Sequence, residues 1–319
     1  MSRNNIRLPG RLKRRRKDSV MNRKEKEGVL LVILCVLMHG AHPILGKYGV
    51  SLVQPLFFAS VTNLIAAVSL ILIILFKKES LLLLIDKRYF LSLLSIGFFG
   101  TTLSSIVFFY GVRLTSGINS AILLQAEPVY SLVIGYLLLQ EKVTTRQIIS
   151  TIVIIIGTVL VIYQGTSRLN WGDILVLLTP LCYQVGHYFS KRLLNQTEIS
   201  PLFIAAGRTF YGGVFLFILN RLAGTGDFKI LTQPNIFAIF IFYGTVVYAL
   251  TYLTFYAAIK RINLSKASAI ISIYPAISIV LANVILKEVP DVYQSSGFLI
   301  VLAGVFYLSN LKSELRKDR

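Results

Sequence analysis

Apolar runs of membrane length follow one another along most of the chain, and short breaks between them hold most of the charged residues. A hydrocarbon core of roughly 30 Å is crossed by about 20 helical residues, so each run predicts one transmembrane helix. Counting these runs predicts ten spans, near residues 29–49, 54–76, 89–111, 117–139, 146–163, 173–193, 200–220, 236–258, 264–286 and 295–311. We therefore expect an all-α membrane protein with ten transmembrane helices and no sizeable soluble domain.

The second half of the chain repeats features of the first half in the same order. Matched positions recur at spacings of 146 or 147 residues: QPLFFASV at 54–61 with SPLFIAAG at 200–207, Pro128 with Pro275, Glu141 with Glu288, and Gly157 with Gly304. Each unit holds five spans, an odd number, so the second unit enters the membrane from the opposite side. Two inverted five-helix repeats are typical of alternating-access carriers, whose substrate site lies near the midplane between the halves.

The distribution of charged residues predicts how the spans are oriented in the membrane. The chain is 55% hydrophobic and 15% charged, with a net charge of +19. If the amino terminus is cytoplasmic, 26 of the 33 basic residues lie on the cytoplasmic side and five lie outside. This bias predicts that both termini are cytoplasmic and that the protein lies in the plasma (inner) membrane. It also explains the net charge without a nucleic-acid partner, because the basic residues sit in tails and short loops.

These patterns divide the chain into four parts. Residues 1–27 form a basic cytoplasmic tail that we expect to be disordered, with Met1 and Met21 as alternative start positions. Residues 28–163 form the first five-helix unit, 172–310 the second, and 311–319 a second cytoplasmic tail. The pattern specifies no oligomeric state.

One long frame resembles a known repeat. The segment INSAILLQAEPVYSLVIGYLLLQEKVTTRQIISTIVIIIGTVLVI at 118–162 has a small-residue start, a mid-helix proline, an LLQE ending and a glycine-bearing fifth helix. In these features it resembles the EamA repeat of the drug/metabolite transporter (DMT) superfamily, and 264–308 is similar. The resemblance implies ten helices in two inverted units and carriage of small metabolites, often outward. MHGAHP at 38–43 departs from the family, which usually has an aromatic residue before this glycine.

Glu127 and Pro128 interrupt the fourth span. A carboxylate in the middle of a span costs roughly 2.5–3.5 kcal/mol, so such acids usually face a bundle interior or an aqueous cavity. At helical spacing Glu127 shares a polar strip with Ser116, Ser120, Tyr130 and Ser131. Pro128 removes the helical donor of the Leu124 carbonyl, so we expect a free carbonyl beside the carboxylate. Glu127 is either a structural residue or the group that binds a substrate ammonium or a proton.

Arg208 is the second charge inside a span, in AAGRTFYGG. A guanidinium keeps its charge, so it has to reach an anion, a carbonyl group or the lipid headgroups. Arg208 could therefore extend toward the membrane surface, pair with Glu127, or hold a substrate carboxylate. The matched position in the first unit is Thr62, next to Asn63, so the second helix is polar there without charge.

Three histidines and several deep tyrosines complete the candidate cavity. His39 and His42 share a face of the first span, and His187 lies at the middle of the sixth span, the counterpart of the first. Imidazoles can bind Zn²⁺ or accept protons near neutral pH, but the chain has no HExxH or paired-cysteine motif, so we expect cavity contacts and no metal. Tyr130, Tyr183 and Tyr274 are too deep for an interfacial belt, and their rings could face a cation.

Together these features predict a secondary transporter for a small polar metabolite, with an amino acid or a similar zwitterion or amine favoured. We expect export by alternating access, driven by a proton or substrate gradient and without a bound cofactor. The alternative is a membrane sensor or scaffold whose cavity binds a small molecule without moving it. An enzyme would need a clustered nucleophile, base and acid, and the sequence shows no such group.

Overall fold

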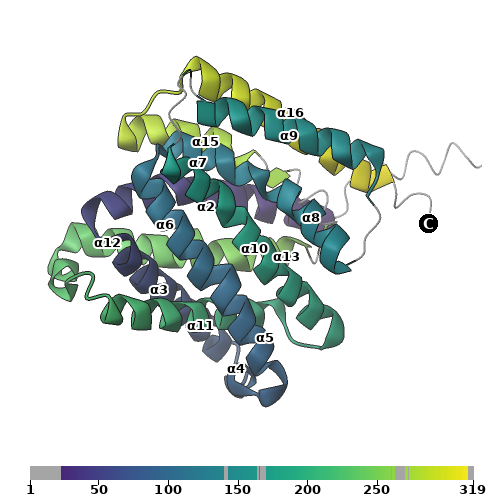
Figure 1. Ribbon diagram of the computed structural model, residues 1–319. Coiled ribbons are helices and arrows are strands. Elements are labelled where there is room, and N and C mark those ends of the chain that lie inside the picture. Colours follow the sequence, from purple (N-terminus) through teal and green to yellow (C-terminus); the bar gives the residue numbers. More distant parts are fainter. Residues whose placement is uncertain are drawn as a thin grey trace, which may run out of the picture.

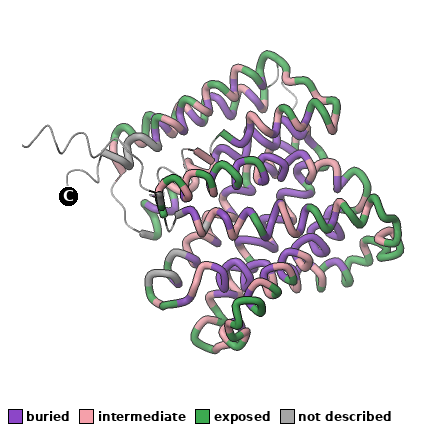
Figure 2. The backbone as a smooth tube through the Cα atoms, turned by 180° about the vertical axis from the view of Figure 1, so that it is seen from behind, coloured by how far each residue is buried: buried purple, intermediate pink, exposed green. Residues whose placement is uncertain are grey.

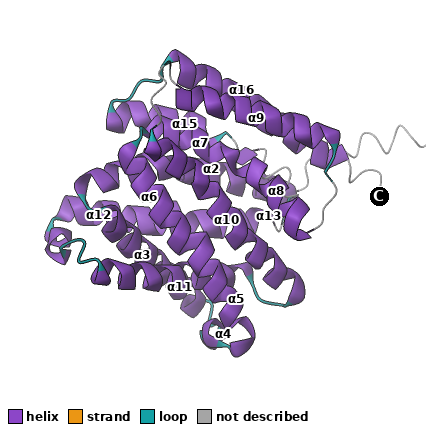
Figure 3. Cartoon of the chain, viewed as in Figure 1, coloured by secondary structure: helices purple, strands orange, loops and turns teal. Residues whose placement is uncertain are grey.

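The structure is a computed structural model of the chain, which describes residues 23–139, 143–163, 165, 170–259, 261–262, 270–271 and 273–314. Every secondary-structure element in those ranges is a helix (Figures 1 and 3). The predicted all-α fold is confirmed. Several predicted features lie outside the described residues: the tail up to residue 22, Glu141, the ninth span at 264–269, and 315–319.

Helices occupy all five predicted spans of the first unit, although the third and fourth spans each consist of several segments joined end to end. In chain order they are α2 (Arg23–Leu52), α3 (Pro55–Phe76), the short α4 (Leu82–Ile85), α5 (Lys87–Gly97), the π-helix η1 (Phe98–Leu103), α6 (Ser104–Leu114), α7 (Gly117–Leu123), the 3₁₀-helix η2 (Leu124–Ala126), α8 (Glu127–Leu139) and α9 (Thr145–Tyr163). The third span is thus α5–η1–α6, and the fourth is α7–η2–α8.

The second unit follows the same order. Its elements are α10 (Trp171–Gln196), α11 (Pro201–Leu222), the 3₁₀-helix η3 (Phe228–Thr232), α12 (Pro234–Phe242), the π-helix η4 (Tyr243–Leu250), α13 (Thr251–Ile259), α15 (Tyr274–Leu281), the π-helix η5 (Ala282–Leu286) and α16 (Val292–Glu314). The eighth span is therefore α12–η4–α13, and it has a π-helix in its middle as the third span does.

Seven helices in the described part of the chain are long and apolar enough to cross a membrane. The ninth and tenth spans contain the shorter apolar helices Tyr274–Leu286 and Val292–Leu308. The sixth span is α10, which has 26 residues but is more polar, since it carries Asp173, Gln184 and His187. Within the described residues, helical segments occupy each of the ten predicted spans wholly or in part, so the chain is a multi-pass membrane protein.

The two units exchange equivalent contacts. The opening helix of the second unit, α10, packs on α6 and α8 of the first unit, and the opening helix of the first unit, α2, packs on α13 and α15 of the second. The second helices of the units, α3 and α11, pack on each other, and the fifth helices, α9 and α16, lie side by side along one edge (Figure 1). Reciprocal contacts of this kind are expected of two structurally equivalent repeats.

Burial follows the expected membrane arrangement. Buried residues concentrate in the middle of the bundle, and exposed residues lie on the outer helices and connections (Figure 2). On α9 the exposed side chains are apolar: Ile148, Ile149, Ile152, Ile155, Ile156 and Val159. Such a face is suited to lipid, because hydrocarbon does not penalise exposed apolar surface.

Candidate functional site

A cavity of about 80 Å³ lies between the two units. Helices α2 and η2–α8 of the first unit contribute to its wall, as do α10, α11, η4–α13 and α15 of the second. The lining residues are His39, His42, Leu124, Glu127, Tyr183, His187, Arg208, Val247, Tyr248, Thr251, Tyr252 and Tyr274. Seven of the candidate residues identified in the sequence come together here, from five different spans: His39, His42, Glu127, Tyr183, His187, Arg208 and Tyr274.

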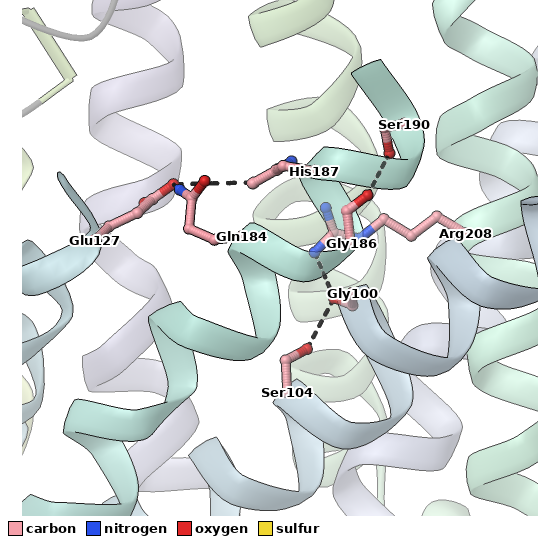
Figure 4. Close-up of polar contacts among 8 residues, drawn as sticks. All are labelled: Gly100, Ser104, Glu127, Gln184, Gly186, His187, Ser190 and Arg208. Carbon is pink, nitrogen blue, oxygen red and sulfur yellow. Dashed lines mark hydrogen bonds and ion pairs between the residues drawn. The ribbon is translucent and has the colours of Figure 1, made fainter. Parts of the chain in front are cut away.

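Glu127 occupies one side of the cavity at the first residue of α8. Its Oε1 accepts a hydrogen bond of 2.7 Å from the Gln184 side-chain amide and lies 3.9 Å from His187 Nε2 (Figure 4). The Glu127 side chain is 45% exposed and that of His187 is 37% exposed, although both lie deep within spans. The carboxylate therefore faces open space in the cavity and is held there by α10.

The surroundings of Pro128 differ from the expectation. The Leu124 carbonyl is not free, because the chain tightens into the 3₁₀-helix η2 and this carbonyl accepts from the backbone N–H of Glu127. Proline removes the usual α-helical donor, and the shorter 3₁₀ bond replaces it. Ser116 and Ser120, the first two residues of the expected polar strip, bond within their own helix. Ser116 Oγ accepts from the Asn119 N–H, and Ser120 Oγ donates to the Ser116 carbonyl.

Arg208 occupies the opposite side of the cavity, and its residue is 2% exposed. Its Nη2 donates to the Gly100 carbonyl at 2.5 Å, and its Nε donates to Thr101 Oγ1 at 3.2 Å. The guanidinium carbon lies 4.8 Å from the ring centre of Tyr252 and 5.7 Å from that of Tyr183, within the range of cation–π attraction. The side chain therefore points into the bundle, which contradicts the interpretation that it extends to the headgroups.

The close approach of two spans places the carbonyl group that Arg208 contacts. Gly100 lies within the π-helix η1, and a Cβ atom added at Gly186 on α10 would lie 2.5 Å from the Gly100 Cα atom. The Gly100 carbonyl also accepts from Ser104 Oγ at 2.8 Å, and Ser190 Oγ donates to the Gly186 carbonyl at 2.9 Å (Figure 4). π-Helical turns are frequent at functional sites, and this one presents a carbonyl to a buried cation.

The three histidines do not form one cluster. His39 packs edge-on against Tyr274, with ring centres 4.6 Å apart, and His42 lies 4.4 Å from Phe108. His187 instead lies beside Glu127. His42 Nδ1 is buried and has no hydrogen-bond partner among the residues that the structure describes. Among the residues that the structure describes, no group of three or more His, Cys, Asp or Glu side chains could hold a metal ion.

Two candidate residues lie away from the cavity lining. Asn63 is 2% exposed, and its amide donates to the Ala59 carbonyl at 2.9 Å and to Ser105 Oγ at 3.4 Å, so it joins α3 to α6. Tyr130 is on α8, one turn from Glu127, and is half-buried outside the lining set.

Other lining or supporting residues were not candidates in the sequence. Gln184 lies one turn before His187 on the same helix, a spacing that would have suggested it. Tyr248 lies within the π-helix η4, and Thr251 and Tyr252 follow it, so the position of their side chains depends on a change of helical pitch that the sequence pattern does not reveal. Leu124 and Val247 are apolar residues without any distinguishing signal.

Comparison with known proteins agrees with this architecture. A family model described as the EamA-like transporter family matches residues 26–163 and 170–310. An uncharacterized transporter of Clostridium kluyveri is 26% identical over 307 residues, covering 92% of this chain and 97% of that protein. The uncharacterized transporter YetK of Bacillus subtilis is 24% identical over 296 residues, covering 90% and 88% respectively.

A solved crystal structure shares the fold, with a TM-score of 0.66 and 14% sequence identity over 91% of this chain and 99% of that chain. The named relatives are transporters, which points away from catalysis. Because the two family matches cover nearly all of both five-helix units, the chain belongs to the EamA-like transporter family of the DMT superfamily and is a membrane transporter, not an enzyme.

Proposed function

We propose that the transporter carries a small zwitterion or amine, with amino acids as the favoured class, and that it exports this substrate by alternating access. The observation that carries the proposal is one cavity between the inverted units with a carboxylate, Glu127, on one side and a guanidinium, Arg208, on the other. A ligand with an ammonium and a carboxylate group complements both charges.

Glu127 supplies the cation-binding side. Its carboxylate accepts from Gln184 and still faces the cavity, so a substrate ammonium or a proton has access to it. Burying an unpaired charge at this depth is costly. Glu127 is therefore suited to alternate between a bound ammonium and a bound proton, which would couple transport to a proton gradient.

Arg208 supplies the anion-binding side. Gly100 and Thr101 fix one edge of the guanidinium, and the rings of Tyr183 and Tyr252 flank it. Arginine presents its five donors in a rigid fork that matches the geometry of a carboxylate, so Arg208 is suited to recognise the substrate carboxylate.

The distribution of basic residues supports the proposed orientation. We place the protein in the plasma membrane with both termini in the cytoplasm, because most basic residues lie on the cytoplasmic side of the spans in this orientation. The Asp173 end of the bundle, where α6 ends and α10 begins, is then external, and the Glu27 end, near the start of α2, is cytoplasmic.

The test is counterflow in proteoliposomes, with labelled amines, carboxylates and zwitterions of similar size as probes. We expect zwitterions or amines to exchange and carboxylates without an amine to fail. Binding without counterflow would instead favour the sensor interpretation. The exposed acid Glu198 offers a matched control, since Glu198→Gln makes the same change outside the cavity.

Neutralising both charges separates a substrate clamp from an internal ion pair. If Glu127 and Arg208 serve only to balance each other, the double variant Glu127→Gln/Arg208→Gln should transport better than either single variant. A clamp for a zwitterion predicts that the double variant is at least as impaired as the worse single variant. The outcome is measured as the initial rate of counterflow.

A further inference from the structure

Three side chains of the second unit bind one short segment of the first unit. This connecting segment, TSGINS at 115–120, joins the end of α6 to the start of α7. The three side chains are Asp173 at the start of α10, Glu288 after η5, and Gln294 at the start of α16. They come from the sixth span, the tenth span and the loop that joins the ninth span to the tenth, so three separate parts of the opposite repeat hold the segment.

Asp173 and Gln294 bind the segment through buried side chains. The Asp173 carboxylate accepts from Thr115 Oγ1 and, at 3.0 Å, from the Asn119 amide. The Gln294 amide in turn donates to Asn119 Oδ1 at 2.7 Å. Asp173 is 1% exposed and Gln294 is 6% exposed, so this network is sealed from solvent. Buried, fully bonded polar networks hold one arrangement strongly because breaking them leaves unsatisfied groups.

Glu288 binds the same segment through its backbone. Its two carboxylate oxygens each accept a bond of 3.0 Å, one from the Gly117 N–H and one from the Ile118 N–H. These N–H groups lie in the first turn of the fourth span, where the helix itself offers them no acceptor. A carboxylate at this position also interacts favourably with the helix dipole. A Cβ atom at Gly117 would lie 2.7 Å from Leu286, so glycine permits this approach.

An aromatic cluster packs around Gly46, one turn beyond His42 on α2, where an added Cβ atom would lie 3.1–3.4 Å from Phe108, Tyr243 and Phe109. Phe58, Phe108, Phe109 and Tyr243 are all 0% exposed, and their rings contact one another. The Tyr243 hydroxyl donates to the His42 carbonyl at 3.2 Å, which joins the cluster to the cavity wall. Lys47, the residue after Gly46 on α2, donates to the Arg113 carbonyl near the end of α6, so the cluster lies on the Asp173 side of His42.

The first unit carries residues of the same kinds at the repeat spacing. Glu27 precedes Asp173 by 146 residues, and Glu141 and Gln147 precede Glu288 and Gln294 by 147. Gln147 and Gln294 occupy equivalent capping positions: Gln147 accepts from the Thr144 N–H at 2.8 Å, and Gln294 accepts from the Asp291 N–H at 3.0 Å. The two halves therefore share this structural device.

The related contact at the other end is looser. Glu27 lies 3.5 Å from Arg261, which is 146 residues after Thr115, and their side chains are 44% and 38% exposed. Exposed ion pairs contribute little to stability. The described contacts are thus buried at the Asp173 end and partly open at the Glu27 end.

We propose that Asp173, Glu288 and Gln294 form a latch on the connecting segment that closes one end of the cavity, and that Glu27 and Arg261 belong to the related latch at the opposite end. Release of the first latch opens the cavity at the Asp173 end. This inference rests on the proposed alternating access and adds the residues that control it.

The test measures from which side a cavity cysteine can be labelled. Val247 lines the cavity near the aromatic cluster and is 1% exposed, so Val247→Cys reports on this route in a Cys35→Ala/Cys182→Ala background. A charged, membrane-impermeant maleimide is added to vesicles of either orientation. We expect Asp173→Ala to raise the labelling rate from the Asp173 end roughly tenfold, since a broken buried network shifts the population between states by about that factor.

The control is Asp227→Ala. Asp227 is an exposed aspartate at the same end, and within the described part of the chain its side chain accepts only the local Lys229 N–H, at 2.9 Å. With Asp227→Ala, the labelling rate should equal that of the parent protein. If Asp173→Ala does not accumulate, Asn119→Ala removes the contacts to Asp173 and Gln294 without removing an acid, and the same rise is expected.

Unchanged labelling from both sides in Asp173→Ala or Asn119→Ala would overturn the latch. The measurement needs no substrate, so its result is independent of the proposed zwitterion specificity. Asp173→Ala could show the expected rise in labelling while the parent protein shows no counterflow of any zwitterion. That result would support the latch and contradict the proposed function.

Discussion

The close contact between Gly186 and Gly100 is the feature that fixes Arg208 in place, and it gives a sharp prediction. Gly186→Ala would place a methyl group 2.5 Å from the Gly100 Cα atom and 2.9 Å from the Gly100 backbone nitrogen. Carbon atoms prefer separations of about 3.5–4.0 Å, so α10 and η1 have to move apart by roughly 1 Å. Neither neighbour is the end of a flexible side chain, so the backbone has to yield.

The cost can be worked from this geometry. Overpacking of this kind costs about 1–3 kcal/mol. The same shift moves the Gly100 carbonyl, which accepts from Arg208 Nη2 at 2.5 Å, and so weakens the hold on the guanidinium. At roughly 2–4 °C per kcal/mol, the melting temperature should fall by about 2–12 °C.

The assay is the fraction of purified protein that stays monodisperse after heating, together with the counterflow rate. Ser190→Ala is the matched control, because it removes the 2.9 Å bond to the Gly186 carbonyl on the next turn without adding volume. It should cost less than about 1 kcal/mol. If Gly186→Ala were as stable and as active as Ser190→Ala, the close approach of the two spans and its role in placing Arg208 would be refuted.

Three further predictions concern individual cavity residues. Arg208→Lys should lower counterflow about tenfold or more, because an ammonium cannot reproduce the fork that contacts Gly100 and Thr101. Tyr252→Phe should keep the cation–π attraction to the Arg208 guanidinium. Tyr252→Leu removes the ring and should cost about 0.5–2 kcal/mol of stability, measured by thermal unfolding. Gln184→Leu should weaken substrate binding about tenfold, measured by titration, because Glu127 loses its 2.7 Å donor.

The sequence predicted the fold well because membrane spans leave a strong local signal. Apolar runs located the helices of both units in the part of the chain that the structure describes, and the spacing of Pro128 and Pro275 revealed the repeat. Intramembrane charge identified Glu127 and Arg208 for the same reason, since hydrocarbon tolerates such residues only where they face polar surroundings.

The remainder depended on tertiary structure. The partner of Arg208 is a backbone carbonyl at Gly100, and a backbone group leaves no mark on the residue pattern. The π-helix η4 rotates Tyr248 and Tyr252 relative to an ideal helix, so spacing alone could not place them. The Leu124 carbonyl was expected to be free, but the chain could satisfy it by a local 3₁₀ turn.

The central claim is that Glu127 binds a substrate ammonium or a proton during transport. The transport rate of the Glu127→Gln variant, measured across the pH range, tests this claim most directly. The other titratable side chains that line the cavity are His39, His42, His187 and four tyrosines, so His187→Gln serves as the comparison for the neighbouring imidazole. We predict a wild-type rate that changes with pH, a His187→Gln variant that keeps this dependence, and a Glu127→Gln variant that is slow and insensitive to pH, since an amide cannot exchange a proton. Equal rates for Glu127→Gln and wild-type protein at every pH would contradict the account.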